Sequence, residues 1–173
     1  MKQIKTYRPD GKLQAHYYQL NGKFHGEYKE WHPNGDLYIH TNYENGQYHG
    51  EYKMWYANGE PYIHTNYENG QYHGEYKMWY SNGEPYIHTN YENGQRHGEY
   101  KQWHINRELY IHSHYVKGEY HGEYKEWNEQ GNLTTHAFWL YGKEVTNEVD
   151  KLVTNRYNIT QEERTLIKLA VGC

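Results

Sequence analysis

Two adjacent stretches of this sequence are almost identical: residues 49–72 read HGEYKMWYANGEPYIHTNYENGQY, and residues 73–96 read HGEYKMWYSNGEPYIHTNYENGQR. They differ at two positions, one of which places Arg96 where the preceding copy has Tyr72. The repeat period is therefore 24 residues. The pattern continues in both directions, loosely over the first 24 residues. We interpret residues 1–144 as six repeats, followed by a tail of different composition.

Each of the best-matched repeats contains two Asn-Gly pairs, such as Asn58-Gly59 and Asn69-Gly70. Asn-Gly is the strongest short signal for a β-hairpin, because a type I′ turn needs a positive φ at both central residues. Two turns per repeat predict two strands per repeat, and about twelve strands in total. The fold class that we expect is mainly β: an elongated, single-layer, antiparallel up-and-down meander of β-hairpin repeats.

The turn positions also predict the strand register. If each Asn-Gly pair is a two-residue loop, Gly50 lies opposite Tyr67, and Thr65 lies opposite Gly74 on the next strand. Side chains alternate along a strand, so one face of the sheet collects most of the tyrosines. The other face is polar, apart from one Trp–Tyr pair in each repeat.

Each repeat has a glycine inside an expected strand, as at Gly50 and Gly74. Glycine usually weakens a strand. We interpret it here as space for a tyrosine ring, with Tyr67 lying over the bare backbone of Gly50. The alternative is that the glycine marks a β-bulge.

The composition explains how such a sheet can fold. Leu, Ile, Val and Phe number only 24 of 173 residues, which is too few for an ordinary aliphatic core, whereas 23 Tyr and 6 Trp raise the aromatic share to 18%. Disordered chains are poor in aromatic residues, so we expect a folded chain with a tyrosine core. A net charge of −4 without a long basic run argues against a nucleic-acid surface.

Other features concern redox state and location. The single cysteine, Cys173, excludes an internal disulfide and a cysteine-based zinc site. The N-terminal residues lack the apolar segment of a signal peptide, and no stretch approaches the ~20 apolar residues of a membrane span. We therefore expect a soluble, cytoplasmic protein.

The tyrosines of the aromatic face are the main candidates for a functional site. Tyrosine combines apolar area with a hydroxyl group, which suits a groove that binds a partner. The alternative is that the rings are simply the core of a thin sheet. The candidate groove residues are Tyr28, Tyr43, Tyr52, Tyr67, Tyr76, Tyr91, Tyr100, Tyr115 and Tyr124.

Histidines stand out on the polar face. We expect His64 to lie between Lys53 and Glu75 in a row of charged side chains. Equivalent histidines lie two strands, or roughly 9–10 Å, apart, which is too far for them to share a metal ion. His112 and His114 share a face and could chelate weakly, but we expect no specific metal site and no cofactor. We also expect no enzyme activity, because an active site is a unique constellation and nearly every polar residue here recurs.

With these motifs in place, the chain resembles the MORN repeat family, in particular its variant with the pattern N-G-x-x-x-G-x-Y-x-x-[WY]-x-x-N-G. The resemblance covers residues 1–144 and departs at Asn106-Arg107 and Lys117-Gly118, where Asn-Gly is expected. It implies elongated sheets with an aromatic groove that act as scaffolds and assembly platforms. Some bacterial members carry an antitoxin-like label, and the near-identical repeats are similar to MORN arrays of large DNA viruses.

The tail predicts a C-terminal helical cap over residues 145–173. Val149, Leu152 and Val153 recur at helical spacing, and Thr160–Glu163 form a capping box that opens a second helix. A single-layer array leaves an apolar end that such a cap covers.

The function that we expect is a non-catalytic scaffold that mediates protein–protein interaction or assembly through the aromatic groove. The sequence does not identify the protein partner, and self-association through one end of the array is a further expectation. The alternative is a ligand-binding module for glycans or choline-like groups, or for an anionic lipid surface. The acidic balance of the chain disfavours the lipid surface.

Overall fold

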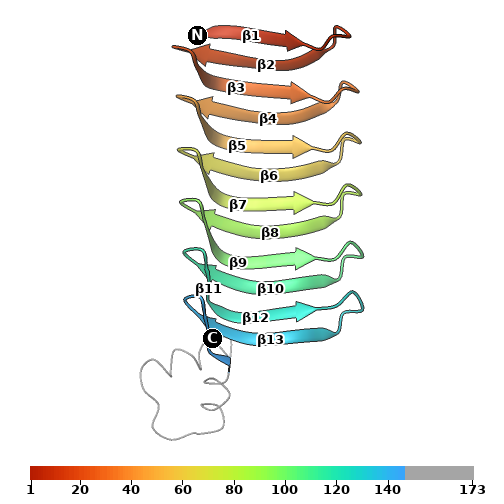
Figure 1. Ribbon diagram of the computed structural model, residues 1–173, viewed down its shortest axis with the longest axis vertical. Coiled ribbons are helices and arrows are strands. Elements are labelled where there is room, and N and C mark those ends of the chain that lie inside the picture. Colours follow the sequence, from red (N-terminus) through yellow and green to blue (C-terminus); the bar gives the residue numbers. More distant parts are fainter. Residues whose placement is uncertain (147–173) are drawn as a thin grey trace, which may run out of the picture. The chain divides into compact units, whose positions relative to one another are not determined.

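The computed structural model describes residues 1–146, which form a mainly β structure (Figure 1). They divide into two compact units, residues 1–94 and the residues from 95 onward, with the boundary at the Asn93-Gly94 turn. Each unit is an antiparallel up-and-down meander of neighbouring strands. The strand segments alternate aromatic or β-branched residues with polar ones, a pattern that suits a half-buried strand.

The first unit contains eight strands that pair in sequence order. The longest are nine residues, and in the central ones a Gln-Tyr-His-Gly-Glu-Tyr segment alternates with a Tyr-Ile-His-Thr-Asn-Tyr segment. The strands are β1 (Lys2–Tyr7), β2 (Leu13–Leu20), β3 (Lys23–Trp31), β4 (Leu37–Glu44), β5 (Gln47–Trp55), β6 (Pro61–Glu68), β7 (Gln71–Trp79) and β8 (Pro85–Glu92).

The second unit follows the order β9-β10-β12-β13-β14, and β11 also pairs with β10. Residues 1–146 thus contain fourteen strands, where the sequence predicted about twelve. One expected strand is divided at His121, next to Gly122 with φ +92°, and one short strand follows the turn at Tyr141-Gly142. The strands are β9 (Gln95–Trp103), β10 (Leu109–Val116), β11 (Glu119–Tyr120), β12 (Gly122–Trp127), β13 (Leu133–Leu140) and β14 (Lys143–Glu144).

The two Asn-Gly pairs of a repeat form different turns. Asn45 and Gly46 have φ of 52° and 88° between paired Glu44 and Gln47, so this is the predicted two-residue type I′ loop. At the other pair, Gly59 has φ +86°, and its amide donates to the carbonyl of Tyr56 (3.0 Å). This second turn is therefore longer than predicted, a three-residue turn closed by a glycine bulge.

The three-residue turns of successive repeats are linked to one another by hydrogen bonds. The Tyr56 hydroxyl donates to the carbonyl of Trp79 (2.8 Å), and the Asn58 side-chain amide donates to the carbonyl of Ser81 (2.7 Å). Equivalent bonds join His32 to Trp55 in the same unit. Each turn therefore satisfies polar backbone groups of the next one, which fixes the spacing of the repeats along this edge.

The predicted register is confirmed for most of the pairing of β5 with β6 and wrong for part of the pairing of β6 with β7. Gly50 lies opposite Tyr67, as predicted from the Asn58-Gly59 turn. Thr65, however, pairs with Tyr76 and not with Gly74, because the register of β6 and β7 shifts between Thr65 and Tyr67. The shift is by two residues, so it changes the partners of Thr65 and Tyr76 and leaves their side chains on the predicted face.

The strand glycines are explained by this shift. Gly50 has φ +76°, and a Cβ added there would meet no heavy atom within 4 Å. The interpretation that Tyr67 fills space over Gly50 is therefore wrong, and the β-bulge alternative holds. Glycine is needed because other residues rarely adopt this backbone conformation, not because the site is crowded.

In the first unit the buried side chains lie on the aromatic face. Thr41, Thr65 and Thr89 are each 1% exposed and Tyr52 is 8% exposed. The predicted cap falls almost entirely outside the described residues, which end at Thr146. Among the described residues, no helix has the length and apolar character needed to cross a membrane.

Candidate functional site

The structure places all nine predicted tyrosines on one face of their strands, the aromatic face. In the first unit, Tyr43 and Tyr67 contact the edges of Tyr28 and Tyr52 at ring-centroid distances of 5.7 and 5.4 Å. These edge-to-face contacts are the preferred geometry of aromatic pairs. The predicted residues are Tyr28, Tyr43, Tyr52, Tyr67, Tyr76 and Tyr91 in the first unit, and Tyr100, Tyr115 and Tyr124 in the second.

A further tyrosine position, missing from the predicted site, joins these rings into a ladder. Tyr48 lies 4.6 Å from Tyr43 and 4.9 Å from Tyr67, measured between ring centroids. Tyr72 repeats this arrangement, 4.6 Å from Tyr67 and 5.0 Å from Tyr91. We call the five rings of Tyr43, Tyr48, Tyr67, Tyr72 and Tyr91 the tyrosine ladder. The recurrence of an aromatic residue every 24 positions, just after the tight turn, was the signal for it.

In the second unit the same position is varied. Tyr120 lies 4.6 Å from Tyr115 and 5.4 Å from Tyr124, again between ring centroids. One repeat earlier, Arg96 occupies the position, with its guanidinium 4.8 Å from the centre of the Tyr100 ring and 5.4 Å from that of Tyr115. A cation over two rings is a favourable replacement for a third ring, and it brings positive charge to the aromatic face.

Burial changes the chemistry of the tyrosine hydroxyls. Desolvation raises the pKa of Tyr43, Tyr52 and Tyr67 far above the ordinary tyrosine value. For Tyr28, desolvation acts together with the nearby charge of Glu30, which accepts a hydrogen bond from its hydroxyl at 3.1 Å. These hydroxyls therefore stay protonated near neutral pH, and they can donate as well as accept hydrogen bonds.

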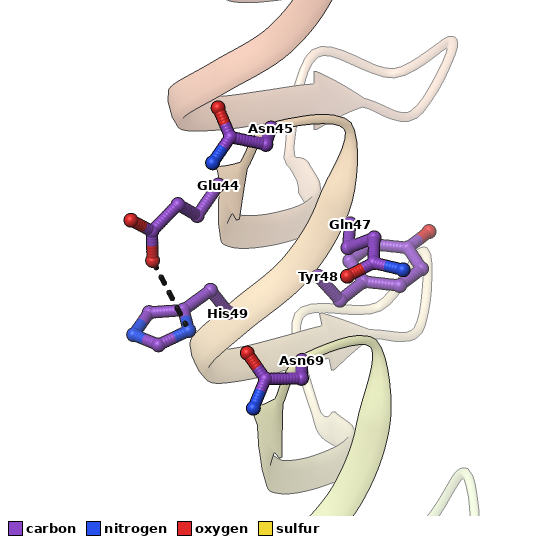
Figure 2. A pocket seen from close by; sticks show the side chains of 6 residues that line it. All are labelled: Glu44, Asn45, Gln47, Tyr48, His49 and Asn69. Carbon is purple, nitrogen blue, oxygen red and sulfur yellow. Dashed lines mark ion pairs between the residues drawn. The ribbon is translucent and has the colours of Figure 1, made fainter.

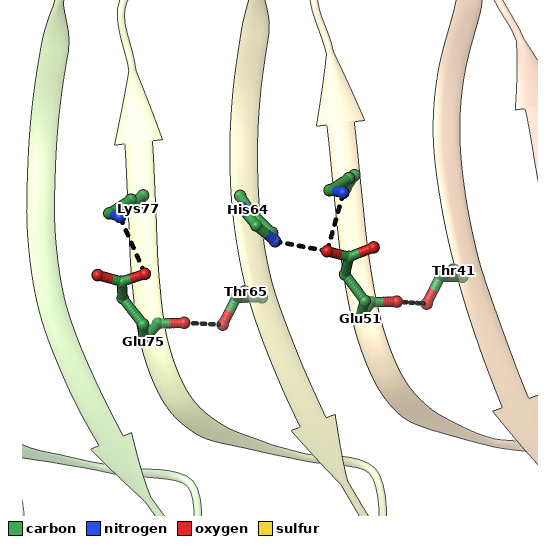
Figure 3. A network of polar contacts seen from close by, with 7 residues as sticks. Thr41, Glu51, His64, Thr65, Glu75 and Lys77 are labelled. Atoms are coloured by element: carbon green, nitrogen blue, oxygen red, sulfur yellow. Dashed lines mark hydrogen bonds and ion pairs between the residues drawn. The ribbon is translucent and has the colours of Figure 1, made fainter.

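Threonines between the rings complete the strand pairing at each bulge. The Thr41 hydroxyl donates to the carbonyl of Glu51 (3.2 Å), and the Thr65 hydroxyl donates to the carbonyl of Glu75 (3.1 Å) (Figure 3). The bulge disturbs the regular backbone ladder at these points, so a side chain supplies the donor. Each of these buried threonines thus bonds to the backbone of the neighbouring strand on the aromatic face.

The opposite face carries a charged triplet in successive repeats. Glu51 accepts from Lys53 at 2.8 Å. It also accepts from His64 at 2.9 Å, a contact that is drawn in Figure 3. The prediction that His64 lies between Lys53 and Glu75 is wrong for Glu75. The residues opposite His64 are Lys53 and Lys77, and its acidic partner is Glu51. Lys53 and His64 together lower the pKa of Glu51 below its ordinary value, although burial opposes them.

The expected Trp–Tyr pairing on this face is also wrong in detail. Trp55 lies opposite Pro61 and not opposite Tyr62, because the three-residue turn shifts the register near its end. Tyr62 instead contacts Tyr56, with the ring centroids 4.7 Å apart. The same pairing recurs between Tyr80 and Tyr86.

A small polar hollow lies beside the tight turn at Asn45 (Figure 2). It measures about 180 Å³, and in Figure 2 the Glu44 carboxylate faces the His49 ring, with an N–O distance of 3.6 Å. The same pair recurs as Glu68 and His73 at 3.5 Å. The hollow is a product of turn geometry that the repeat reproduces, and its size suits only water or a small ion.

One group could hold a metal ion. Glu99, His112 and His114 each offer a donor atom, and all three atoms lie within 4.8 Å of one another. The sequence placed His112 and His114 on one face, which the structure confirms with a ring-centroid distance of 5.6 Å. It did not identify Glu99, because its position depends on the register between β9 and β10.

Comparisons with known proteins bear on the repeats. The family described as MORN repeat variant matches three consecutive segments, residues 24–45, 48–69 and 72–93. No curated protein matches the chain. Among solved structures, the crystal structure of GtfA/B complex bound to UDP and GlcNAc matches with a TM-score of 0.27 and 10% identity, over 75% of this chain and 24% of that chain. A likeness this weak carries no argument about function.

Proposed function

From the premise that this chain is a MORN-repeat protein, with three consecutive repeats in residues 24–93, we propose that it is a non-catalytic scaffold that binds a protein partner along its aromatic face. The repeats supply one binding element several times on a regular framework. Repeat proteins commonly use such extended surfaces to bind other proteins.

The tyrosine ladder is the observation that carries this proposal. Its rings follow one another across β4 to β8, with centroid distances between 4.6 and 5.0 Å. Rings such as Tyr48 and Tyr72 are only partly buried, in contrast to Tyr52 at 8% exposure. The ladder therefore offers apolar area that folding has not consumed, with protonated hydroxyls beside it. Tyrosine is enriched in binding interfaces for this combination of properties.

The spacing of the ladder favours a particular kind of protein segment. Equivalent rings, such as Tyr48 and Tyr72, lie two strands apart, or about 9.4–9.8 Å for ordinary strand spacing. A polyproline II helix repeats every three residues, which is about 9.3 Å. A proline-rich segment lying across the strands therefore presents the same side of its helix to each repeat. Aromatic surfaces bind such segments because little conformational entropy remains to be lost.

The proposal is tested with one substitution on each face. Tyr72→Arg adds a charge to the ladder at a position where the next repeat already has Arg96, so the fold accommodates it. Asn66→Arg adds the same charge to an exposed position on the opposite face and is the matched control. A peptide of Pro-Pro-Leu repeats is titrated into the full chain and both variants by calorimetry, with a Gly-Ser peptide of equal length for comparison.

We expect the proline-rich peptide to bind, the Gly-Ser peptide not to bind, and Tyr72→Arg to weaken binding at least tenfold while Asn66→Arg does not. Equal weakening by both variants would contradict a role of the aromatic face. If the peptide fails to bind while oligosaccharides bind in a Tyr72-dependent manner, the face is a glycan-binding surface and the protein-scaffold proposal is wrong.

A further inference from the structure

On the face opposite the tyrosines, one repeat differs in a way that brings three metal-binding side chains together. Glu99 on β9 and His112 and His114 on β10 bring their donor atoms within 4.8 Å of one another. Within residues 1–146, this is the one group of three such side chains that meets this distance. We propose that Glu99, His112 and His114 bind a divalent transition-metal ion of the zinc type.

The register of β9 and β10 holds the three side chains together. His114 lies directly opposite Glu99, and His112 is two residues before His114, on the same face. The His112 Nε2 atom is 2.9 Å from a Glu99 carboxylate oxygen, and the two imidazole ring centroids are 5.6 Å apart. Zinc ligands at about 2.0–2.2 Å from the ion lie about 3–3.5 Å from one another. Small side-chain rotations are therefore enough to close the set around an ion.

The neighbouring repeats provide the comparison that singles out this one. Glu75 and His88 form the same pair as Glu99 and His112, with an N–O distance of 2.9 Å. The residue two positions after His88 is Asn90, where the next repeat has His114. An amide is a poor ligand for zinc, whereas two imidazoles and one carboxylate form a common zinc ligand set with a position left for water. The third ligand thus comes from a single substitution against the repeat.

One neighbouring charge competes with a metal ion for these ligands. Lys101 opposes metal binding, since its ammonium group lies 2.8 Å from the Glu99 carboxylate and must move away.

Zn²⁺ binding to the full chain, produced without a polyhistidine tag, tests the proposal at pH 7.5 by titration calorimetry. His114→Asn restores the residue of the preceding repeat, so it removes a ligand without a new demand on the fold. We expect it to weaken Zn²⁺ binding at least tenfold. His88→Asn removes the histidine equivalent to His112 from a repeat that lacks the third ligand, and we expect it to leave the affinity unchanged.

A gain of binding gives the second arm of the test. Asn90→His builds the same three ligands beside Glu75 and His88, and we expect the stoichiometry to rise from one ion to two. Absorption of Co²⁺ in place of Zn²⁺ reports whether nitrogen and oxygen ligands surround the ion. Equal affinity in the native chain and His114→Asn, equal loss in His114→Asn and His88→Asn, or an unchanged stoichiometry in Asn90→His would each overturn the proposal.

Discussion

The bulge glycine at Gly50 allows a direct test of what the repeated glycines do. Gly50 has φ +76°, and there is open space where a Cβ would lie. Gly50→Ala therefore introduces no clash, and its cost comes from the backbone alone. A left-handed conformation costs an ordinary residue about 1–2 kcal/mol, and the stiffer unfolded chain of the alanine variant returns about 0.4–1 kcal/mol. We expect a net loss of about 1 kcal/mol in the free energy of unfolding.

A second substitution at Gly50 separates backbone conformation from space. Asparagine is larger than alanine but tolerates positive φ, as Asn45 does at 52° in the adjacent tight turn. Gly50→Asn should therefore cost less than Gly50→Ala. For a chain of this size, a change of 1 kcal/mol moves the melting temperature by about 2–4 °C, which differential scanning calorimetry resolves.

The order of the two variants decides between the explanations. If the glycine made room for the Tyr67 ring, the larger asparagine would be the more damaging substitution. A lower melting temperature for Gly50→Asn than for Gly50→Ala would therefore refute the backbone argument. An unchanged melting temperature in both variants would refute it as well, because it would mean that the strand relaxes without cost.

Three further expectations follow from the same structure. Lys117 adopts φ +52° at a turn position that asparagine occupies in other repeats, so Lys117→Asn should stabilise the chain by about 0.5–1 kcal/mol in urea unfolding. Thr65→Val removes the donor to the Glu75 carbonyl at nearly constant volume, and chemical denaturation should report a loss of about 1–2 kcal/mol. Lys53 is the main cause of the lowered pKa of Glu51. A carboxylate whose pKa is lower in the folded state contributes to stability above its unfolded pKa, and this contribution is lost as the pH falls through the folded pKa. Melting temperatures measured below pH 4.5 should therefore fall more steeply for the native chain than for Glu51→Gln.

The faces of the strands could be predicted from the sequence, whereas the partners of each residue could not. The face on which a side chain lies depends only on whether its position in the strand is odd or even. A two-residue shift at the bulge therefore left Tyr67 and Tyr76 on the predicted face. Cross-strand neighbours depend on the position of every bulge. A repeated glycine is compatible with either a bulge or a close approach, and the sequence alone did not decide between them.

The candidate site was predicted in part for the same reason. The tyrosines of the middle of the strands were recognised because their alternation is regular. Tyr48 and Tyr72 sit beside the tight turn, and the two-residue loop alone pairs them with Tyr43 and Tyr67. Their ring contacts with the strand on the other side were not predicted. Glu99 lies opposite His114 in the same register that pairs Glu51 with Asn66. It was missed because the turn between β9 and β10 has Asn106-Arg107 in place of Asn-Gly.

The second unit departs from the near-identical repeats of residues 49–96 at a few separate positions. Arg96, Arg107, His114 and Lys117 each replace the residue of the preceding repeats. A row of identical repeats offers the same contacts at every step, so a partner bound to it can slide by one repeat at no cost. A unique charge or metal ligand removes this degeneracy, because one register then gains an interaction that the others lack. Under the proposed function, Arg96 is the departure that a partner on the aromatic face would contact, because its guanidinium lies over the Tyr100 and Tyr115 rings.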